Sequence, residues 1–525
     1  MTRLRREISL KKRPKALAQM SGAFSRTAME DFAQMVWAVW GLQQKVTVEQ
    51  ARGLTTHPRE AVVHHLHSEF GIQPWELESL FNLKILNVRD ARQQVLPCNH
   101  WDVASAFCNL LRQLEEIESG INLNQENVLL ELHRIAQRQF SWQSGFVNTA
   151  DMYRYFFLYG LGGCATFFEG HYGISIENFT KSGFALFAQF ANRPLATRPL
   201  DYSMLSIDAG TIEAAVAMMT VPQSQARQQL SDLRTKQDTA NEPTAYQPSL
   251  LRKYPIMAFG SEGERLRAPL PPLIMLRITA GLYYDLLPGG GGLRNEVAKQ
   301  FEIYCQRYIA AVMPAFDVQP EYSYPRGRGT QQQDSPDILI GYQGRLAIVA
   351  ECKATKLTFS AQFAGDPALA APGKYDELAK GVFQIWRFFS HCRRGLTRHT
   401  VDDQTYGLLL TVETWMVMSG GLQDHVLRRA RTMAAADPDM QPQDQRRVVF
   451  AAIQDLERVL SKTDEEGFLN TLAAANEERF LGWMLPNIQT DGDGSVDQGL
   501  FPFELGDILP WWREFNERQA TRTGI

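Results

Sequence analysis

The sequence lacks a strong charge of either sign. Its 54 Lys and Arg residues nearly balance 58 Asp and Glu residues, which gives a formal net charge of −4 at pH 7. This balance excludes a uniformly basic surface for nucleic acid, but it leaves room for a local basic surface. Long apolar runs are also absent, because the longest uncharged run, 155–168, is too short to span a bilayer and contains three glycines. We therefore expect no contact with a membrane.

Cysteine is scarce, and none of the six cysteines belongs to a CxxC pair. The six positions are Cys98, Cys108, Cys164, Cys305, Cys352 and Cys392. A few scattered cysteines in a long chain are typical of reduced thiols. No apolar segment with a cleavage site follows the basic N-terminus, which argues against a signal peptide. Both observations predict a cytoplasmic protein, and the missing CxxC pairs argue against a structural zinc site.

The chain is long: its 525 residues predict roughly two to four domains. Apolar residues at helical spacing predict a mostly helical N-terminal region over 1–221. A polar stretch, 222–249, is the predicted linker. It precedes a predicted central α/β domain with a mixed sheet over 250–426 and a helical C-terminal region over 427–525. The expected fold class is therefore α+β with several domains.

The first 20 residues carry seven Lys and Arg residues against one acid, Glu7. Such a run is typical of a solvated, partly disordered arm. The alternative is an arm that contacts phosphates. The helical N-terminal region as a whole could provide targeting, regulation, a surface for a partner protein, or contacts between copies of the chain.

Two apolar segments within 335–356 predict a β-hairpin. The first follows Asp337, the second covers 346–350, and Gly341 and Gly344 bracket the turn between them. Side chains on a strand alternate between its two faces, so Glu351 and Lys353 point the same way. Asp337 begins the partner strand and is expected beside them. The hairpin therefore brings two carboxylates and an ammonium together at one place on a sheet.

This combination of side chains suits a divalent cation. Mg²⁺ takes oxygen ligands, usually one or two carboxylates together with water and substrate phosphate. The metal polarises a phosphodiester and lowers the pKa of a bound water. A neighbouring lysine can position or deprotonate that water. The alternative is a structural hairpin that ends in a surface ion pair.

Pro336-Asp337 and Glu351-Cys352-Lys353 resemble the signature of the PD-(D/E)xK nuclease superfamily, whose fold is restriction-endonuclease-like. The resemblance covers about 291–412, a minority of the chain. It implies a nuclease that uses Mg²⁺ or Mn²⁺, with Asp337 and Glu351 as metal ligands and Lys353 as the residue that acts on water. Cys352 lies between two motif residues, so its side chain is expected on the opposite face as core filler.

The segment 294–309 is a predicted helix with one apolar stripe. At 100° per residue, Glu302 falls at the edge of this stripe, and Glu296 falls on the opposite face. A carboxylate at the rim of a buried face needs a partner or a metal. The pair Phe301-Glu302 resembles the first helix of PD-(D/E)xK nucleases, which implies a third metal ligand at Glu302, with Glu296 as the fallback. The alternative is that Glu302 only borders the apolar face.

Two segments are candidates for binding nucleic acid. The first is a loop with Arg326 and Arg328, since arginine binds phosphate through a planar fork. The second is the predicted helix 375–396, which carries a polar and basic stripe at helical spacing. The stripe consists of Lys380, Gln384, Arg387, His391 and Arg394. In both segments the alternative is an ordinary solvated surface.

The function that these expectations support is metal-dependent hydrolysis of DNA, by an endonuclease rather than an exonuclease. The layout of a helical region joined to a nuclease-like domain resembles restriction and phage-defence nucleases of bacteria. The main alternative is a non-catalytic scaffold that binds nucleic acid or regulates another protein and retains only the nuclease-like fold. A third alternative is a helical interaction protein in which the hairpin match is accidental.

Overall fold

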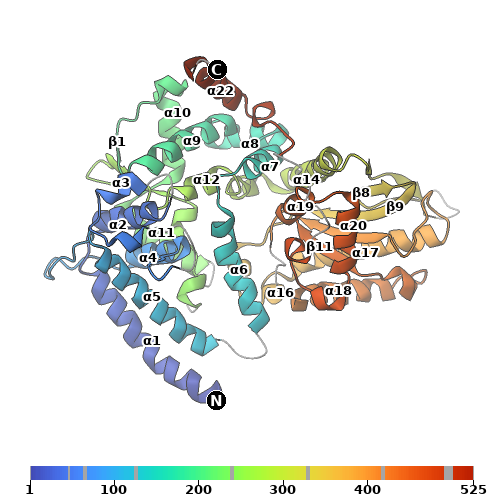
Figure 1. Ribbon diagram of the computed structural model, residues 1–525, viewed down its shortest axis with the longest axis horizontal. Helices are drawn as coiled ribbons and strands as arrows, with labels where there is room; N and C mark the ends of the chain where they lie inside the picture. Colours follow the sequence, from blue (N-terminus) through green and yellow to red (C-terminus); the bar gives the residue numbers. More distant parts are fainter. Residues whose placement is uncertain are drawn as a thin grey trace. The chain divides into compact units, whose positions relative to one another are not determined.

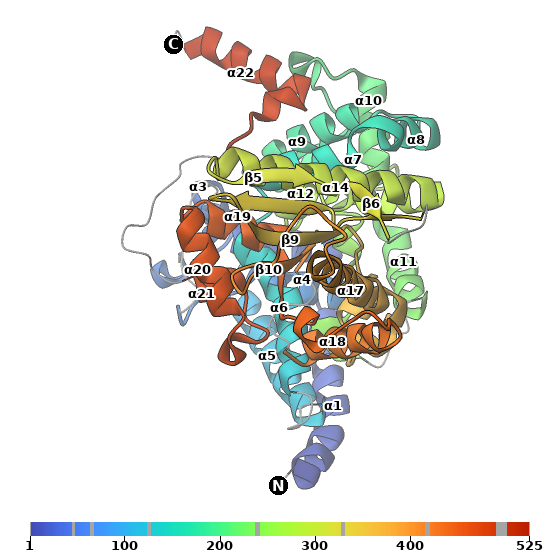
Figure 2. The same cartoon turned by 90° about the vertical axis from the view of Figure 1, so that its right-hand side faces the viewer.

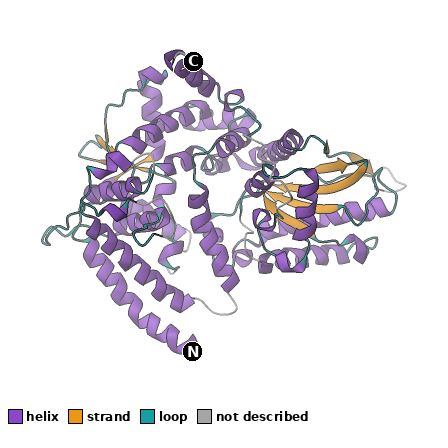
Figure 3. Ribbon diagram, viewed as in Figure 1, coloured by secondary structure: helices purple, strands orange, loops and turns teal. Residues whose placement is uncertain are grey.

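The computed structural model describes residues 2–44, 48–62, 68–122, 128–236, 242–326, 331–414, 420–489 and 501–523. The chain forms two compact units, and both are labelled by element in Figure 1. Unit 1 comprises Met1–Gln125, Arg138–Gly289 and Leu505–Ile525, and unit 2 comprises Glu126–Gln137 and Gly290–Glu504. Helices dominate unit 1, whereas unit 2 combines helices with a five-stranded sheet (Figure 3). The fold is therefore α+β with more than one unit.

The boundaries of these units differ from the ranges that composition suggests. The polar stretch 222–249 lies within unit 1, and most of its first half is helix α11 (Gln223–Lys236), which buries Ala226 and Leu230. The division falls instead at the four-glycine run, between Gly289 and Gly290. The segment 427–504 belongs to unit 2, where it supplies a strand of the main sheet.

Unit 1 is built from helices whose apolar residues recur every three or four positions. In α5, for example, Phe107, Leu111 and Leu114 are buried at this spacing. The helices of unit 1 are α1 (Thr2–Phe24), α2 (Met29–Leu42), α3 (Val48–Arg52), α4 (Pro74–Leu86), α5 (Trp101–Asn122), α7 (Thr149–Tyr159), α8 (Gly162–Tyr172), α9 (Ile176–Asn192), α10 (Ala209–Met219), α11, α12 (Pro272–Ile278), α13 (Leu282–Leu286) and α22 (Pro510–Thr523). Helix α6 (Val128–Ser144) begins in the chain segment of unit 2 and ends in that of unit 1. A small sheet in unit 1 has the order β1-β4-β3-β2, formed by β1 (Ala196–Thr197), β2 (Thr220–Pro222), β3 (Ile256–Phe259) and β4 (Arg265–Arg267).

The basic N-terminal residues form a regular helix in unit 1. Helix α1 packs along α5 and buries Met20 and Phe24, and Arg13 forms an ion pair with Glu118 at 2.9 Å. This stretch is therefore a packed helix rather than a disordered arm. Across the described residues, no helix is long and apolar enough to cross a membrane.

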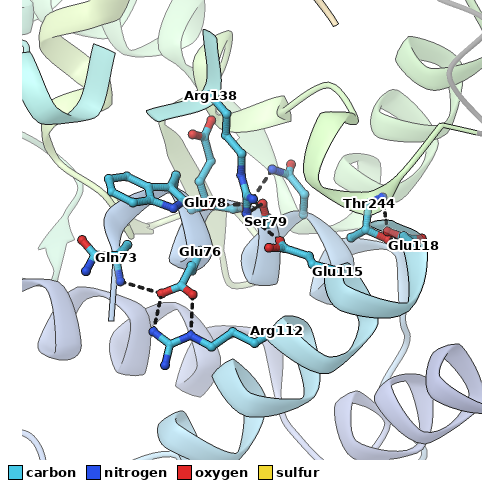
Figure 4. A network of polar contacts seen from close by, with 11 residues as sticks. Gln73, Glu76, Glu78, Ser79, Arg112, Glu115, Glu118, Arg138 and Thr244 are labelled. Atoms are coloured by element: carbon cyan, nitrogen blue, oxygen red, sulfur yellow. Dashed lines mark hydrogen bonds and ion pairs between the residues drawn. The ribbon is translucent and has the colours of Figure 1, made fainter. Parts of the chain in front are cut away.

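Paired charges link the helices of unit 1 (Figure 4). Glu76 accepts hydrogen bonds from Arg112 Nε at 2.6 Å and Nη2 at 2.9 Å, and it also caps the start of α4 by accepting from the backbone N–H of Gln73. Glu78, two residues along, accepts hydrogen bonds from Arg252 and Trp142. These buried carboxylates are held by guanidinium and N–H donors, as a stable interior requires.

Unit 2 begins with the long helix α14 and is organised around five strands. Its elements are α14 (Gly290–Val312), β5 (Asp317–Pro320), β6 (Ser323–Pro325), β7 (Gln332–Asp334), β8 (Ile338–Tyr342), β9 (Arg345–Lys353), α15 (Phe359–Gln362), α16 (Pro367–Ala370), α17 (Pro372–Arg393), β10 (Tyr406–Thr411), α18 (Gly420–Ala435), β11 (Val448–Ala452), α19 (Ile453–Leu460), α20 (Glu465–Ala475) and α21 (Leu485–Ile488).

The main sheet has the order β11-β10-β9-β8-β5. Strands β9, β10 and β11 are parallel, whereas β8 is antiparallel to both β9 and β5. The expected hairpin is formed by β8 and β9, with Gln343 at φ 50° and Gly344 at φ 78° in its turn. Two consecutive residues with positive φ are the requirement of a tight type I′ turn, which explains the glycine at 344. Because β8 runs against β9, β8 begins at the edge of the sheet where the three parallel strands end.

Helices cover both faces of this sheet (Figure 2). Helix α17 packs on one face, where its Leu378, Val382 and Ile385 join a buried cluster with Val349 and Leu409 from the strands. Helix α14 contacts β5 and β9. The side chain of Cys352, which points away from Glu351 and Lys353, meets Cys305 of α14. The end of β9 is therefore enclosed by a helix on each side.

Candidate active site

The pairing of β8 with β9 places Asp337 and Glu351 together. Ile338 is paired with Ala350 in this antiparallel ladder, so the residue before Ile338 lies opposite Glu351. Residues opposite each other in an antiparallel pair share one face of the sheet. Asp337 is 9% exposed, and its Oδ2 accepts a hydrogen bond of 2.7 Å from the backbone N–H of Cys352. This bond holds the Asp337 side chain at the end of strand β9.

Glu351 and Lys353 lie on the face of the sheet that α17 covers. Lys353 Nζ donates a hydrogen bond of 2.6 Å to Glu351 Oε1, and the Glu351 side chain is only 1% exposed. Within the described part of the chain, the second carboxylate oxygen, Oε2, has no hydrogen-bond partner. A buried carboxylate oxygen without a partner is costly, and such an atom is a candidate for contact with a ligand, an ion or water.

The environment of Glu351 raises its pKa from 4.5 to about 7, because burial disfavours the charged form. Lys353 opposes this effect, while the charges of Asp337 and Glu302 reinforce it. The pKa of Asp337 is raised for the same first reason, burial. Burial lowers the pKa of Lys353, but attraction to Glu351 and Asp337 outweighs it, so that the net direction is upward. The site therefore contains a protonated lysine and two carboxyl groups that resist ionisation together.

Glu302 lies on α14, within electrostatic reach of both other carboxylates. Its Oε2 accepts a hydrogen bond of 2.8 Å from Lys299 Nζ, which also bonds Glu321 at 2.8 Å. Burial raises the pKa of Glu302, the hydrogen bond from Lys299 lowers it, and the charge of Asp337 raises it again, with a net upward direction. Glu302 thus borders the site, held by an ammonium. The fallback residue Glu296 lies on the same helix, α14, and is half-buried.

Two further residues contact the site, although sequence patterns did not single them out. Gln306, one turn after Glu302 on α14, donates a hydrogen bond of 3.1 Å from Nε2 to the backbone carbonyl of Asp337. Gly381 of α17 lies directly over Glu351 and Lys353. The contact of Gln306 could have been suspected from its helical spacing to Glu302. Nothing in the local sequence marks the contact of Gly381, because strand and helix are far apart along the chain.

The predicted basic stripe on α17 is divided by the structure. Lys380 is exposed, Gln384 and Arg387 are half-buried, and Arg394, just beyond the helix end, is paired with Asp439 at 2.7 Å. His391 lies at the expected spacing but is 3% exposed, and its Nδ1 shares a hydrogen bond of 2.9 Å with Tyr324 Oη. The part of the stripe that faces solvent is therefore shorter than the sequence suggests.

Arg387, one of the basic residues of the stripe, interacts electrostatically with the Glu351 carboxylate. Burial lowers the pKa of its guanidinium, and the positive charge of Arg326 lowers it further, whereas the charge of Glu351 raises it. The guanidinium lies over the ring of Phe383 at 5.5 Å. Arg326 is exposed, and Arg328 lies outside the described residues. Arg387 thus lies within electrostatic reach of Glu351, and Arg326 lies within electrostatic reach of Arg387, so that the two arginines form a cationic flank.

The carboxylates do not by themselves complete a metal cage. Within the described ranges, no three side chains of His, Cys, Asp or Glu are grouped closely enough to hold an ion. The groups available for a metal are the unpartnered Glu351 Oε2 and the Asp337 carboxylate on the same face, with Glu302 at the border. This donor set consists only of oxygen, which suits a hard cation such as Mg²⁺ rather than zinc.

Known proteins give no independent guide to this site. Comparison of the chain with protein-family models, with characterised proteins and with solved structures finds no match. The function must therefore be argued from the chemistry of these residues.

Proposed function

We propose that unit 2 is a restriction-endonuclease-like domain of the PD-(D/E)xK kind, and that it hydrolyses phosphodiester bonds of DNA with Mg²⁺ or Mn²⁺. One observation carries this proposal. A buried glutamate, Glu351, turns one oxygen to a lysine and leaves the other without a partner among the described residues, opposite Asp337 at the end of a strand. The spacing of Asp337, Glu351 and Lys353 is that of the nuclease signature.

The donor set supports a metal of this class. Mg²⁺ is usually held by one or two protein carboxylates, with water and substrate phosphate in the remaining positions, so a pair of carboxylates is sufficient. A divalent cation bound here would polarise the phosphodiester and lower the pKa of a water. It would also oppose the effect of burial on the pKa of Glu351, because a nearby cation favours the ionised carboxylate. Asp337 and Glu351 would hold it, and Glu302 would assist once it leaves Lys299.

Other groups of the chain position Asp337 and the attacking water. The N–H of Cys352 and the amide of Gln306 fix the Asp337 side chain and backbone before any ligand arrives. Lys353 keeps its proton, because its pKa lies above the ordinary value. A charged ammonium cannot accept a proton from water, so Lys353 orients the attacking water and offsets negative charge on the phosphate. Of the two roles that the sequence left open, these electrostatics favour orientation.

The cationic flank supports a polyanionic substrate. Arg387 lies within electrostatic reach of Glu351 and of Arg326, and Lys380 is exposed on the same helix as Arg387. A guanidinium that is partly buried without an ion pair among the described residues gains stability from an incoming phosphate. Gln384, half-buried between Lys380 and Arg387, is placed to bond a phosphate or sugar oxygen.

The test is cleavage of supercoiled plasmid by the full chain with Mg²⁺, Mn²⁺ or EDTA, beside single-stranded DNA and RNA. The proposal expects metal-dependent nicking that Glu351→Gln and Lys353→Ala abolish. Asp455→Asn is the matched control, because Asp455 is also a buried carboxylate of unit 2, 2% exposed, with its pKa raised by burial to about 6, but it lies in the first turn of α19, after β11. This control should cleave normally. DNA binding without cleavage under all conditions would favour the non-catalytic scaffold instead.

A further inference from the structure

Helix α17 approaches strands β9 and β10 closely at a glycine, Gly381. Gly381 is buried, and a Cβ atom added to it would lie 2.6 Å from Leu409 Cδ1, 3.0 Å from Lys353 Cε and 3.2 Å from Glu351 Cγ. Real Cβ atoms do not approach a heavy atom to 2.6 Å, and a contact of 3.0 Å requires the neighbour to move. Any side chain at this position would therefore compete for space with the two site residues.

The glycine is not explained by the helix itself. Glycine destabilises the interior of a helix relative to alanine, and its usual justification is a positive φ or a close approach of the backbone to another group. Gly381 lies in the middle of α17, whose φ there is not positive. Close approach is therefore the remaining reason. Gly373, in the first turn of the same helix, has no neighbour within 4 Å of an added Cβ, so the constraint is specific to the position over the site.

The close approach of Gly381 is to Lys353 Cε, the carbon bonded to the ammonium nitrogen, so it affects the position of the charge. The stem of Lys353 lies between the strand and the helix backbone, and Nζ donates to Glu351 Oε1 at 2.6 Å. A long lysine side chain has many rotamers. The backbone of α17 at Gly381 packs against Cε and excludes the rotamers in which the ammonium turns toward solvent. With Oε1 occupied in this way, Oε2 is the oxygen of Glu351 left for a ligand.

We propose that Gly381 is a positioning residue of the active site, because its missing side chain lets α17 hold the Lys353 ammonium against one oxygen of Glu351 and leave the other for the metal. This inference rests on the proposed nuclease function for its effect on rate. Its effect on the Lys353–Glu351 pair is independent of catalysis. Gly381 touches no reacting atom and acts through Lys353.

The expected consequence of Gly381→Ala follows from the contacts. Leu409 can rotate its methyl group away, but Lys353 Cε must shift, which moves Nζ from Glu351 Oε1. Misplacement of a catalytic group by about 1 Å can cost about a hundredfold in rate. The shift required of Lys353 Cε is a few tenths of an ångström, so we expect kcat to fall by up to about tenfold with little change in KM.

The experiment compares Gly381→Ala with the control Gly373→Ala and with the double variant Gly381→Ala/Leu409→Val. The double variant removes the closest contact, so it remains testable if the single variant does not fold. The proposal expects wild-type kcat and KM for the control, and a lowered kcat at nearly unchanged KM for both variants at 381. A folded variant at 381 with the wild-type kcat would overturn it, and so would full recovery in the double variant.

A second readout separates this inference from the nuclease proposal. Crystal structures of the metal-free variants show where Lys353 Nζ lies. A longer distance from Lys353 Nζ to Glu351 Oε1 in Gly381→Ala than in Gly373→Ala supports the positioning role even if the wild-type protein cuts no nucleic acid. Equal distances in the two variants would overturn it even if the protein is a nuclease.

Discussion

Two buried glutamates, one in each unit, differ in how their oxygens are satisfied. Glu78 in unit 1 is 5% exposed and accepts hydrogen bonds from Arg252 at 2.8 Å and 3.2 Å and from Trp142 at 2.8 Å. Burial raises its pKa, but the charge and hydrogen bonds of Arg252 outweigh burial, and the net direction is downward. Glu351 in unit 2 has one lysine, an oxygen with no partner among the described residues, and a pKa raised to about 7.

The difference separates a carboxylate that stabilises the fold from one that is suited to bind. A fully bonded buried charge contributes to a defined arrangement of helices, and the polar network around Glu76 and Glu78 does this for unit 1 (Figure 4). A buried carboxylate that lacks a hydrogen-bond partner for one oxygen gains more stability from a bound cation than a fully hydrogen-bonded carboxylate does. Strongly raised pKa values that gather at one edge of a sheet are a mark of such sites.

The largest expected effect is on catalysis. If the proposed function holds, Glu351→Gln, Asp337→Asn or Lys353→Ala should each lower the rate of DNA cleavage by about ten-thousandfold, or about 5 kcal/mol of transition-state stabilisation, because each would remove a proposed metal ligand or the neighbouring cation. Single-turnover cleavage at saturating DNA measures this. Glu302→Gln should cost less, because Glu302 borders the site and is held by Lys299. Near-normal cleavage by Glu351→Gln would place the chemistry elsewhere in the chain.

The second effect concerns the stability of unit 1. Arg252→Ala leaves Glu78 buried without its main counter-charge, so the free energy of unfolding should fall by about 3–5 kcal/mol. Urea unfolding followed by circular dichroism measures it. The double variant Arg252→Ala/Glu78→Gln should recover part of the loss, because no unpaired charge remains. A small effect of Arg252→Ala would mean that Glu78 is as poorly satisfied as Glu351, and the comparison would fail.

The third effect is the pH dependence of stability in metal-free protein. A carboxyl group with a higher pKa in the folded protein than in the unfolded chain binds its proton more tightly when folded. The free energy of unfolding should therefore fall as pH rises from about 4.5 to about 7, the ordinary and folded pKa values of Glu351. At about 1.4 kcal/mol for each tenfold change in proton affinity, the loss is about 3 kcal/mol.

Glu351→Gln should remove most of this loss and make metal-free protein more stable than wild type at pH 8. Asp455, whose pKa is raised to about 6, should produce a smaller loss in the same direction, which Asp455→Asn removes. Urea unfolding at pH 5 and pH 8 distinguishes the two contributions. Mg²⁺ should restore stability at pH 8 in wild type but not in Glu351→Gln. A flat pH profile in wild type would mean that Glu351 is not buried as a charged group.

The smallest expected effect concerns binding. Lys380→Ala/Arg387→Ala should lower the slope of log K against log salt for DNA by about two, at roughly one for each phosphate contact. Arg394 should add little, because it is already paired with Asp439. Fluorescence anisotropy with a catalytically inactive variant measures the slope. An unchanged slope would assign these residues to the support of the sheet, and Arg394→Ala serves as the control.

Local sequence predicted the parts of this site that depend on strand geometry. Alternation places Glu351 and Lys353 on one face, and the glycines around Gln343 predict the turn, because positive φ favours glycine. Strand β11 was missed, because its five residues, VVFAA, lie in a stretch expected to be helical. A short apolar run does not reveal whether it is strand or helix.

The rest depends on contacts that spacing along one element cannot show. His391 falls on the polar stripe of α17, yet Tyr324 from another segment covers it. The polar stretch 222–249 predicts a linker, yet it contains helix α11, which buries Ala226 and Leu230. Gly381 and Gln306 matter only because distant strands pass beside them. Such tertiary contacts override local composition.

The proposed function requires Glu351 and Asp337 to hold a divalent cation. Anomalous diffraction from crystals of the protein soaked in Mn²⁺ locates such an ion, with Glu351→Gln crystals as the control. We expect a peak about 2 Å from Glu351 Oε2 and from an Asp337 oxygen in wild type, and no peak there in the variant. A peak elsewhere, or none in protein that still cleaves DNA with Mn²⁺, would contradict it.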